Sequence, residues 1–192
     1  MPALTLDRRT ALVLIDLQKG ITSLPTIEPS DAIVANSARL AAAFRSRGLP
    51  VVLVRTAHSA DGRDRLAPRT DAPAISIKRD ADFSDLSPEL GLGGNDIVIT
   101  KRQWDAFFGT ELDLQLRRRE VTGIVLAGIA TSMGVESTAR QAFSLGYQIA
   151  FAMDATTDLI QTAHENSLRT IFPHIGQIAM TDAIIASLAV GG

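Results

Sequence analysis

A carboxylate and an amine each follow a short apolar segment in this sequence. Asp16 comes directly after Leu12–Ile15, and Lys101 comes after Ile97–Thr100. If both segments are parallel strands, their carboxyl ends meet at one edge of a sheet and the two side chains can share a cleft. Burial would raise the pKa of Asp16, and a nearby cation would lower it. The pair predicts acid–base or electrostatic chemistry; a turn-capping Asp and a solvated Lys are the alternatives.

A third segment of interest runs from Gly128 to Thr138, after an apolar run and at the start of an expected helix. The first N–H groups of a helix have no intrahelical partner, and together with the helix dipole they favour an anion or a developing oxyanion. An ordinary strand-to-helix turn built from small residues is the alternative interpretation.

The segments that must position these residues read as alternating strands and helices. Apolar runs without in/out alternation predict strands buried on both faces, at 11–15, 51–54, 97–99, 124–127 and 149–153. Helical patterns lie between them, and five helices are expected. One carries Ile33, Ser37, Leu40 and Phe44 on one face. A short one covers 112–119, and the next buries Val135, Thr138, Ala139, Ala142 and Phe143. Another spans 161–172, and the last starts at Thr181 as N-cap and buries Ile184, Ile185 and Leu188.

This order predicts one domain over residues 1–192, a doubly wound (Rossmann-like) α/β three-layer sandwich with a parallel sheet of about six strands. The segment 57–95 is rich in Asp, Arg, Pro and Gly and lacks periodicity. Loops of that length in a compact domain are usually functional or mobile.

Composition excludes several classes of function. The chain has no cysteine, which excludes disulfides, thiolate zinc sites and thiol nucleophiles. Its net charge of -2 gives no reason to expect nucleic acid or an anionic membrane as a partner. No apolar stretch approaches the roughly 20 residues of a membrane helix, and 1–9 lacks a signal-peptide pattern. We therefore expect a soluble, cytoplasmic protein.

The same three segments carry a family resemblance. Residues 12–18, 101–112 and 128–142 closely resemble, in order and spacing, the signature segments of the isochorismatase-like (cysteine hydrolase) superfamily. The tail, with Asp154-Ala155, His164 and Ser167-Leu168, is similar as well. The resemblance covers nearly the whole chain and implies a hydrolase that forms a homo-oligomer, a dimer or tetramer.

In that family an Asp, a Lys and a Cys form the catalytic triad. Asp16 and Lys101 match the first two positions, but the cysteine position falls on Gly134. Thiolate attack on an amide is therefore not available. True isochorismatases resemble this chain in having Gly there, and they hydrolyse a vinyl ether with water. The resemblance implies that a protonated Asp16 supplies a proton to the substrate, with Lys101 as its electrostatic partner.

Other family features map onto single residues. The resemblance implies a cis peptide at Ile129–Ala130 and an oxyanion hole formed by the backbone N–H groups of Ala130 and Gly134. Nicotinamidases of the family bind a metal through an Asp-x-His element and a second His. Here the stretch is Thr56-Ala57-His58 with no second His following, so neither a metal nor another cofactor is expected.

Four residues are predicted to contact a small-molecule substrate, namely Gln18, His58, Trp104 and Phe107. For each of them a structural or solvated role is the alternative. Three functional hypotheses follow for the chain. The first is a thiol-free hydrolase acting on a vinyl ether such as isochorismate. The second is a family member that has lost catalysis and binds a ligand or partner, and the weakest is an amidase using Ser132.

Overall fold

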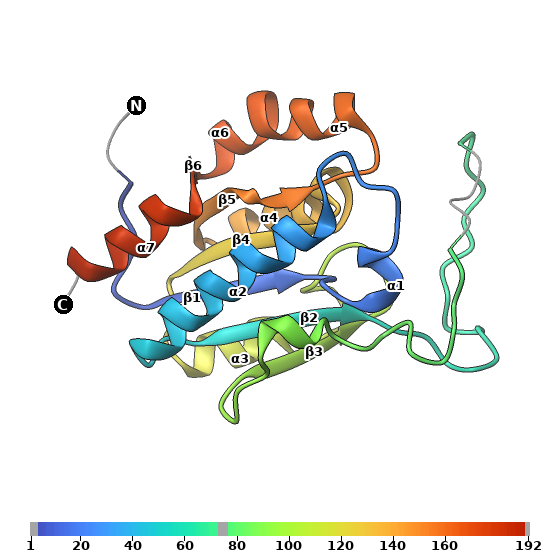
Figure 1. Ribbon diagram of the computed structural model, residues 1–192, viewed down its shortest axis with the longest axis horizontal. Helices are drawn as coiled ribbons and strands as arrows, with labels where there is room; N and C mark the ends of the chain where they lie inside the picture. The colour runs from blue at the N-terminus through green and yellow to red at the C-terminus, as the bar shows by residue number, and fades with distance from the viewer. Residues whose placement is uncertain (1–3, 73–76, 191–192) are drawn as a thin grey trace.

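The computed structural model describes residues 4–72 and 77–190 and contains a sheet of six strands in the order β3-β2-β1-β4-β5-β6 (Figure 1). All neighbouring strands are parallel. The strands are β1 (Thr10–Ile15), β2 (Val51–Thr56), β3 (Ile97–Lys101), β4 (Gly123–Ile129), β5 (Gln148–Thr157) and β6 (Gln177–Ala179). The predicted α/β three-layer fold with about six parallel strands is confirmed.

Helices cover both faces of the sheet. One face packs against α2 (Ser30–Ser46) and α7 (Thr181–Val190). The other packs against α3 (Leu112–Arg118), α4 (Glu136–Ser144) and α6 (Phe172–Ile175). The remaining elements are short: α1 (Lys19–Thr22), η1 (Pro88–Leu90), η2 (Thr131–Val135), α5 (Gln161–Asn166) and η3 (Ser167–Ile171), of which η2 and η3 are π-type turns.

The apolar strand segments are explained by this sandwich. Val13 and Ile15 belong to the core on the α3/α4 side, and Leu12 and Leu14 belong to the core on the α2 side. A strand buried on both faces has no polar positions to alternate with, so its sequence is continuously apolar.

The direction of winding reverses between β1 and β4. The chain moves outward from β1 to β2 and β3, then returns and moves outward again from β4 to β5 and β6. Ile15 at the end of β1 pairs with Gly128 near the end of β4. In open α/β sheets, ligands bind beyond the carboxyl ends of the strands at this switch point.

Three details differ from the sequence-based expectations. β6 has only three residues, Gln177–Ala179, too few to form an apolar run in the sequence. Phe143, expected on the buried face of its helix, is 54% exposed. Thr181 is the first residue of α7 rather than the N-cap before it, and its N–H and hydroxyl both donate to Asp154 Oδ1, at 2.7 and 2.8 Å.

The long segment between β2 and β3 is largely irregular, as its composition indicated. Residues 60–72 and 77–80 project away from the sheet (Figure 1). Nearer the body the segment is anchored, because Gln18 forms an isolated bridge with Leu86 and Gly20 N–H donates to Phe83 O.

Gly128 is expected to be intolerant of any side chain. Its φ is +124°, and a Cβ would lie 2.1 Å from Ile15 O, in the backbone of β1. Gly146 also has positive φ, +84°, but has open space around it. We predict that Gly146→Ala lowers the free energy of unfolding by about 1–2 kcal/mol, the cost of the backbone conformation. Gly128→Ala is predicted to cost several times more or to prevent folding, as measured by urea denaturation. Equal costs at the two positions would contradict this view of the β1–β4 approach.

Candidate active site

Asp16 and Lys101 form a buried ion pair at the carboxyl edge of the sheet. Lys101 Nζ lies 2.7 Å from Asp16 Oδ2, and the two side chains are 2% and 9% exposed. Asp16 follows the last residue of β1, and Lys101 is the last residue of β3, two strands away. The structure thus brings together the two groups that the sequence placed at separate strand ends.

The ammonium group of Lys101 is held by three acceptors. Besides Asp16 it donates to the backbone oxygens of Gln103 at 3.1 Å and Trp104 at 2.8 Å. An ammonium group has three N–H donors, so each has a partner. The loop that follows β3 therefore folds back over its own lysine and fixes the charge beside Asp16.

Asp16 is strained, buried and only half satisfied. Its φ of +52° is in the left-handed region, which non-glycine residues adopt mostly where function or local structure demands it. Oδ2 meets Lys101, whereas the buried Oδ1 has no hydrogen-bond partner among the described residues. Burial raises the pKa of Asp16, and the charge and hydrogen bond of Lys101 oppose this rise. Oδ1 is therefore the atom suited to carry or deliver a proton.

The turn after β4 presents Gly134 to this ion pair. A Cβ on Gly134 would lie 3.4 Å from Asp16 Oδ2, 3.4 Å from Lys101 Nζ and 2.9 Å from Ile15 Cγ2. A side chain at residue 134 would therefore lie directly beside the acid and the amine, and even its Cβ would require Ile15 Cγ2 to shift. The Ile129–Ala130 peptide is cis, as the resemblance implied. The oxyanion hole formed by the N–H groups of Ala130 and Gly134 stays a prediction.

The turn is wound as a π-type turn rather than a regular helical one. Both Met133 N–H and Val135 N–H donate to Ala130 O, at 3.2 Å each. Single π-turns of this kind often occur at functional sites. Thr138 continues the structure, because its hydroxyl donates to Gly134 O at 2.7 Å and accepts from Ala106 N–H at 3.1 Å. One side chain thus ties the turn to the loop that carries the Lys101 acceptors.

Gln18 lies close to the site but is occupied by the backbone. Its Nε2 donates to Thr56 O and Phe83 O at 3.0 Å each, and its Oε1 accepts from Thr56 N–H at 2.7 Å. The side chain is fully buried. With both donors and the acceptor engaged, Gln18 fastens the end of β2 and the long loop to the end of β1. In this arrangement it offers no free hydrogen to a substrate.

His58 stands near the start of the long loop, in a strongly charged setting. Its Nδ1 lies 3.8 Å from Asp64 Oδ1, and Arg102 Nε lies 2.7 Å from Asp64 Oδ2. Burial lowers the pKa of His58, and the charge of Arg79 adds to this effect. The imidazole is therefore neutral near pH 7, and contact with a substrate stays a prediction.

The two predicted aromatic contacts are placed differently. Phe107 is buried in the core on the α3/α4 side, with its ring centroid 5.8 Å from that of Tyr147. It is a packing residue in this structure. Trp104 is 60% exposed, and its backbone oxygen rather than its ring contacts Lys101.

A polar cluster beneath the turn was not predicted from the sequence. Thr131 Oγ1 lies 2.8 Å from His164 Nδ1, and Ser132 N–H donates to Asp158 Oδ2 at 2.7 Å. His164 belonged to the tail segment that carried the family resemblance, but no local pattern indicated its partner. Contacts between residues that lie 26 to 33 positions apart depend on how β5 and α5 pack against the turn.

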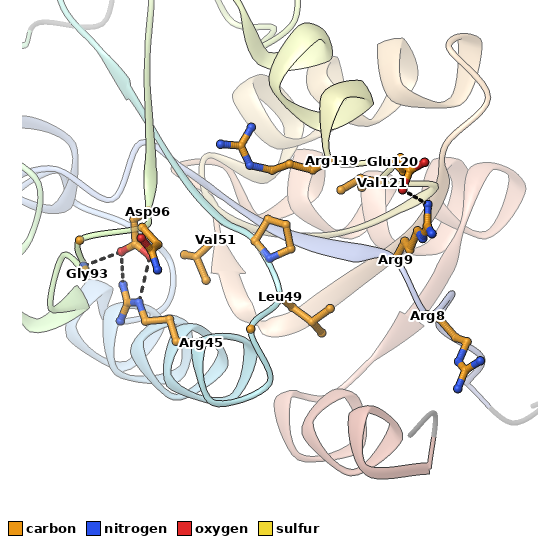
Figure 2. A pocket seen from close by; sticks show the side chains of 14 residues that line it. Arg8, Arg9, Arg45, Leu49, Val51, Gly93, Asp96, Arg119, Glu120 and Val121 are labelled. Atoms are coloured by element: carbon orange, nitrogen blue, oxygen red, sulfur yellow. Dashed lines mark hydrogen bonds and ion pairs between the residues drawn. The ribbon is translucent and has the colours of Figure 1, made fainter.

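A large hollow lies at the opposite edge of the sheet (Figure 2). Its volume is about 730 Å³, and it is lined by residues that precede β1, β2, β3 and β4. Four arginines and two carboxylates line it; Arg45 donates to both carboxylate oxygens of Asp96, and Arg9 pairs with Glu120. It is at the amino ends of the strands, so it is not part of the Asp16 site.

Within residues 4–72 and 77–190, no group of three or more His, Asp or Glu side chains is arranged to hold a metal ion. In the same part of the chain, no helix is both long and apolar enough to cross a membrane.

Comparison with known proteins identifies the family. Residues 10–183 match the isochorismatase domain. The chain is 48% identical over 188 residues to the isochorismatase family protein YwoC of Bacillus subtilis (strain 168), covering 96% of this chain and 97% of that protein. It is 43% identical over 184 residues to YecD of Escherichia coli O157:H7, another isochorismatase family protein, covering 94% and 97%.

A solved structure and a more distant relative agree with this. The structure of an isochorismatase family protein from Burkholderia thailandensis superposes with a TM-score of 0.92 at 45% identity, covering 96% of this chain and 98% of that one. The ureidoacrylate amidohydrolase RutB of Variovorax paradoxus (strain S110) is 28% identical over 208 residues, covering 94% of this chain and 81% of that protein. The chain therefore belongs to the isochorismatase family.

Proposed function

We propose that this protein is a hydrolase that uses water as its nucleophile and Asp16 as its acid. We further propose that the substrate is a vinyl ether, with isochorismate as the compound to test first. The observation that carries the proposal is the position of Gly134. Its Cα faces the ion pair: a Cβ there would lie 3.4 Å from both Asp16 Oδ2 and Lys101 Nζ, and 2.9 Å from Ile15 Cγ2.

We place the attacking water on this side of the ion pair, beyond the Cα of Gly134. A water oxygen there would lie close to a carboxylate oxygen that can accept its proton and to an ammonium that favours developing negative charge. A relative with cysteine at residue 134 would have its nucleophile in the same place. Without the side chain, the protein keeps the acid–base and electrostatic partners but must take its nucleophile from solvent.

The reaction then proceeds in three proton transfers. Protonated Asp16 gives its proton from Oδ1 to the terminal carbon of the vinyl ether, whose C=C electrons form the new C–H bond. The oxocarbenium ion that results is attacked by water, which forms a C–O bond and returns a proton to the Asp16 carboxylate. As the ether C–O bond of the hemiketal breaks, the hydroxyl proton moves to the departing ether oxygen, which releases a carbonyl compound and an alcohol. Raising the pKa of Asp16 by burial favours the first transfer.

A binding protein without catalysis is the second candidate. It is favoured by the small exposure of the ion pair, 2% and 9% for the two side chains. Amide hydrolysis, the activity named for RutB, is the third and would need a nucleophile such as Ser132.

One prediction of this proposal concerns turnover of isochorismate. We expect the parent protein to hydrolyse it, and Asp16→Asn to lower kcat/KM by about 10²–10⁴-fold, the usual contribution of a general acid. The measurement is release of the carbonyl product under steady-state conditions. Glu120→Gln removes an equal charge from an exposed residue at the amino edge, and we expect it to leave kcat/KM unchanged.

The other outcomes each select a rival. If the parent binds isochorismate tightly but hydrolyses neither it nor any other vinyl ether in a panel, the result would support the binding protein. Amide turnover that survives in Asp16→Asn and disappears in Ser132→Ala would support the amidase.

Another prediction concerns the stability of the ion pair. Lys101→Met leaves the Asp16 carboxylate buried without a counterion, and removing one partner of a buried pair costs about 3–5 kcal/mol. Without Lys101 the pKa of Asp16 rises further above its unfolded value. The carboxyl group is then neutral at low pH, and stability is lost as pH rises through the folded-state pKa.

Urea denaturation at pH 5 and pH 8 measures this effect. The deficit of Lys101→Met relative to the parent is expected to be larger at pH 8, and the double variant Asp16→Asn/Lys101→Met is expected to remove the pH dependence. A deficit that is the same at both pH values would show that Asp16 does not depend on Lys101.

A further inference from the structure

Thr131, at the start of the π-type turn, is the centre of a fully enclosed polar cluster. Its Oγ1 lies 3.0 Å from Thr157 O, 3.0 Å from Thr156 Oγ1 and 2.8 Å from His164 Nδ1. All four residues are buried. Hydrogen bonds between buried groups are electrostatically stronger than those in water, and a buried polar group left without a partner lowers the stability of the fold.

The available protons decide the state of His164. Thr156 donates its hydroxyl proton to Gly128 O at 2.8 Å, and Thr131 donates its own to Thr157 O, because carbonyl oxygens only accept. If Thr131 donates its hydroxyl proton to Thr156 Oγ1 instead, that proton is again not available for a hydrogen bond to His164. In either arrangement, the 2.8 Å contact with His164 is a hydrogen bond only when Nδ1 carries the proton and donates.

The opposite tautomer, in which Nδ1 of His164 is unprotonated, leaves fewer polar groups of the cluster hydrogen-bonded. If Thr131 donates to an unprotonated Nδ1, Thr157 O loses its hydroxyl donor and no proton is gained elsewhere in the cluster. Burial also lowers the pKa of His164, against the opposing charge of Asp158, which favours the uncharged ring. A neutral ring with the proton on Nδ1 meets both conditions.

The cluster supports the part of the turn that faces the ion pair. Thr131 is flanked by Ala130, whose oxygen closes the π-type turn, and by Ser132, whose N–H is fixed by Asp158. The same Asp158 carboxylate accepts from the N–H groups of Leu159 and Ile160, at 2.8 and 3.1 Å. The turn is therefore held by side chains from the region after β5.

We infer that His164, as the neutral Nδ1–H tautomer, is a positioning residue that holds the turn 130–135 through Thr131 and so sets the place of Gly134 beside Asp16 and Lys101. It acts through Thr131 and does not touch the reacting atoms. The expected effect of His164 on turnover rests on the proposed function, whereas the assignment of its tautomer does not. The two are therefore tested separately.

Nitrogen NMR of the parent protein tests the tautomer without any substrate. The chain has three histidines, so the ring nitrogens of His164 can be assigned by comparison with His58→Gln and His174→Gln. At pH 7.5 we expect Nδ1 of His164 to have the shift of a protonated nitrogen and Nε2 that of an unprotonated one. The reverse pattern, or two protonated nitrogens, would overturn the inference.

Kinetics test the positioning role. The amide nitrogen of Asn can take the place of Nδ1, while that of Gln takes the place of Nε2. We therefore expect His164→Asn to keep kcat for isochorismate within about threefold, and His164→Gln to lose at least about tenfold in kcat at nearly constant KM, since small displacements in a site are costly. Thr131→Ser and Thr131→Val form the matching pair, with the hydroxyl kept and removed.

The outcomes separate the two proposals. Equal kcat values for His164→Asn and His164→Gln, with both folded, would contradict the positioning role even if the tautomer is as expected. If the parent does not turn over isochorismate at all, the proposed function fails, and the NMR result alone decides whether His164 holds Thr131.

Discussion

The buried ion pair between Asp16 and Lys101 is the interaction on which the rest of the site depends. Neither group tolerates burial alone, since an uncompensated charge in a protein interior costs several kcal/mol. The sheet brings them together from β1 and β3, and the loop after β3 adds two carbonyl oxygens to the ammonium. The arrangement leaves Oδ1 of Asp16 without a hydrogen-bond partner in the described chain. In the proposed reaction this is the oxygen that delivers the proton.

Two glycines give this pair its surroundings for different reasons. Gly128 lets β4 approach the backbone of β1 so closely that no side chain would fit. Gly134 lies beside the acid and the amine, and a side chain there would contact both once Ile15 Cγ2, 2.9 Å from its Cβ, had shifted. The first is required by the sheet. The second determines which nucleophile is available, because the same backbone could carry a nucleophilic side chain at residue 134.

Much of this could be predicted from the sequence, because the strands are buried on both faces and their apolar segments are unambiguous. Asp16, Lys101 and Gly134 were placed at strand ends, and chain order then brought them to one edge. What the sequence did not reveal depends on tertiary contacts. Gln18 and Phe107 have the residue types of a binding site, yet one is occupied by backbone groups and the other by the core. The Thr131–His164 contact joins segments whose packing no local pattern describes.

The central claim is that residue 134 faces Asp16 and Lys101 together. A thiol introduced there by Gly134→Cys tests it most directly, because the chain has no other thiol. The pKa of this introduced thiol is obtained from the pH dependence of its alkylation by iodoacetamide. Loss of a nearby cation raises a thiol pKa, and loss of a nearby anion lowers it. We expect Lys101→Met to raise the pKa of the introduced thiol and Asp16→Asn to lower it, with neither change affecting a thiol introduced by Ser132→Cys to a comparable extent. A thiol at residue 134 whose pKa responds to neither substitution would contradict the account.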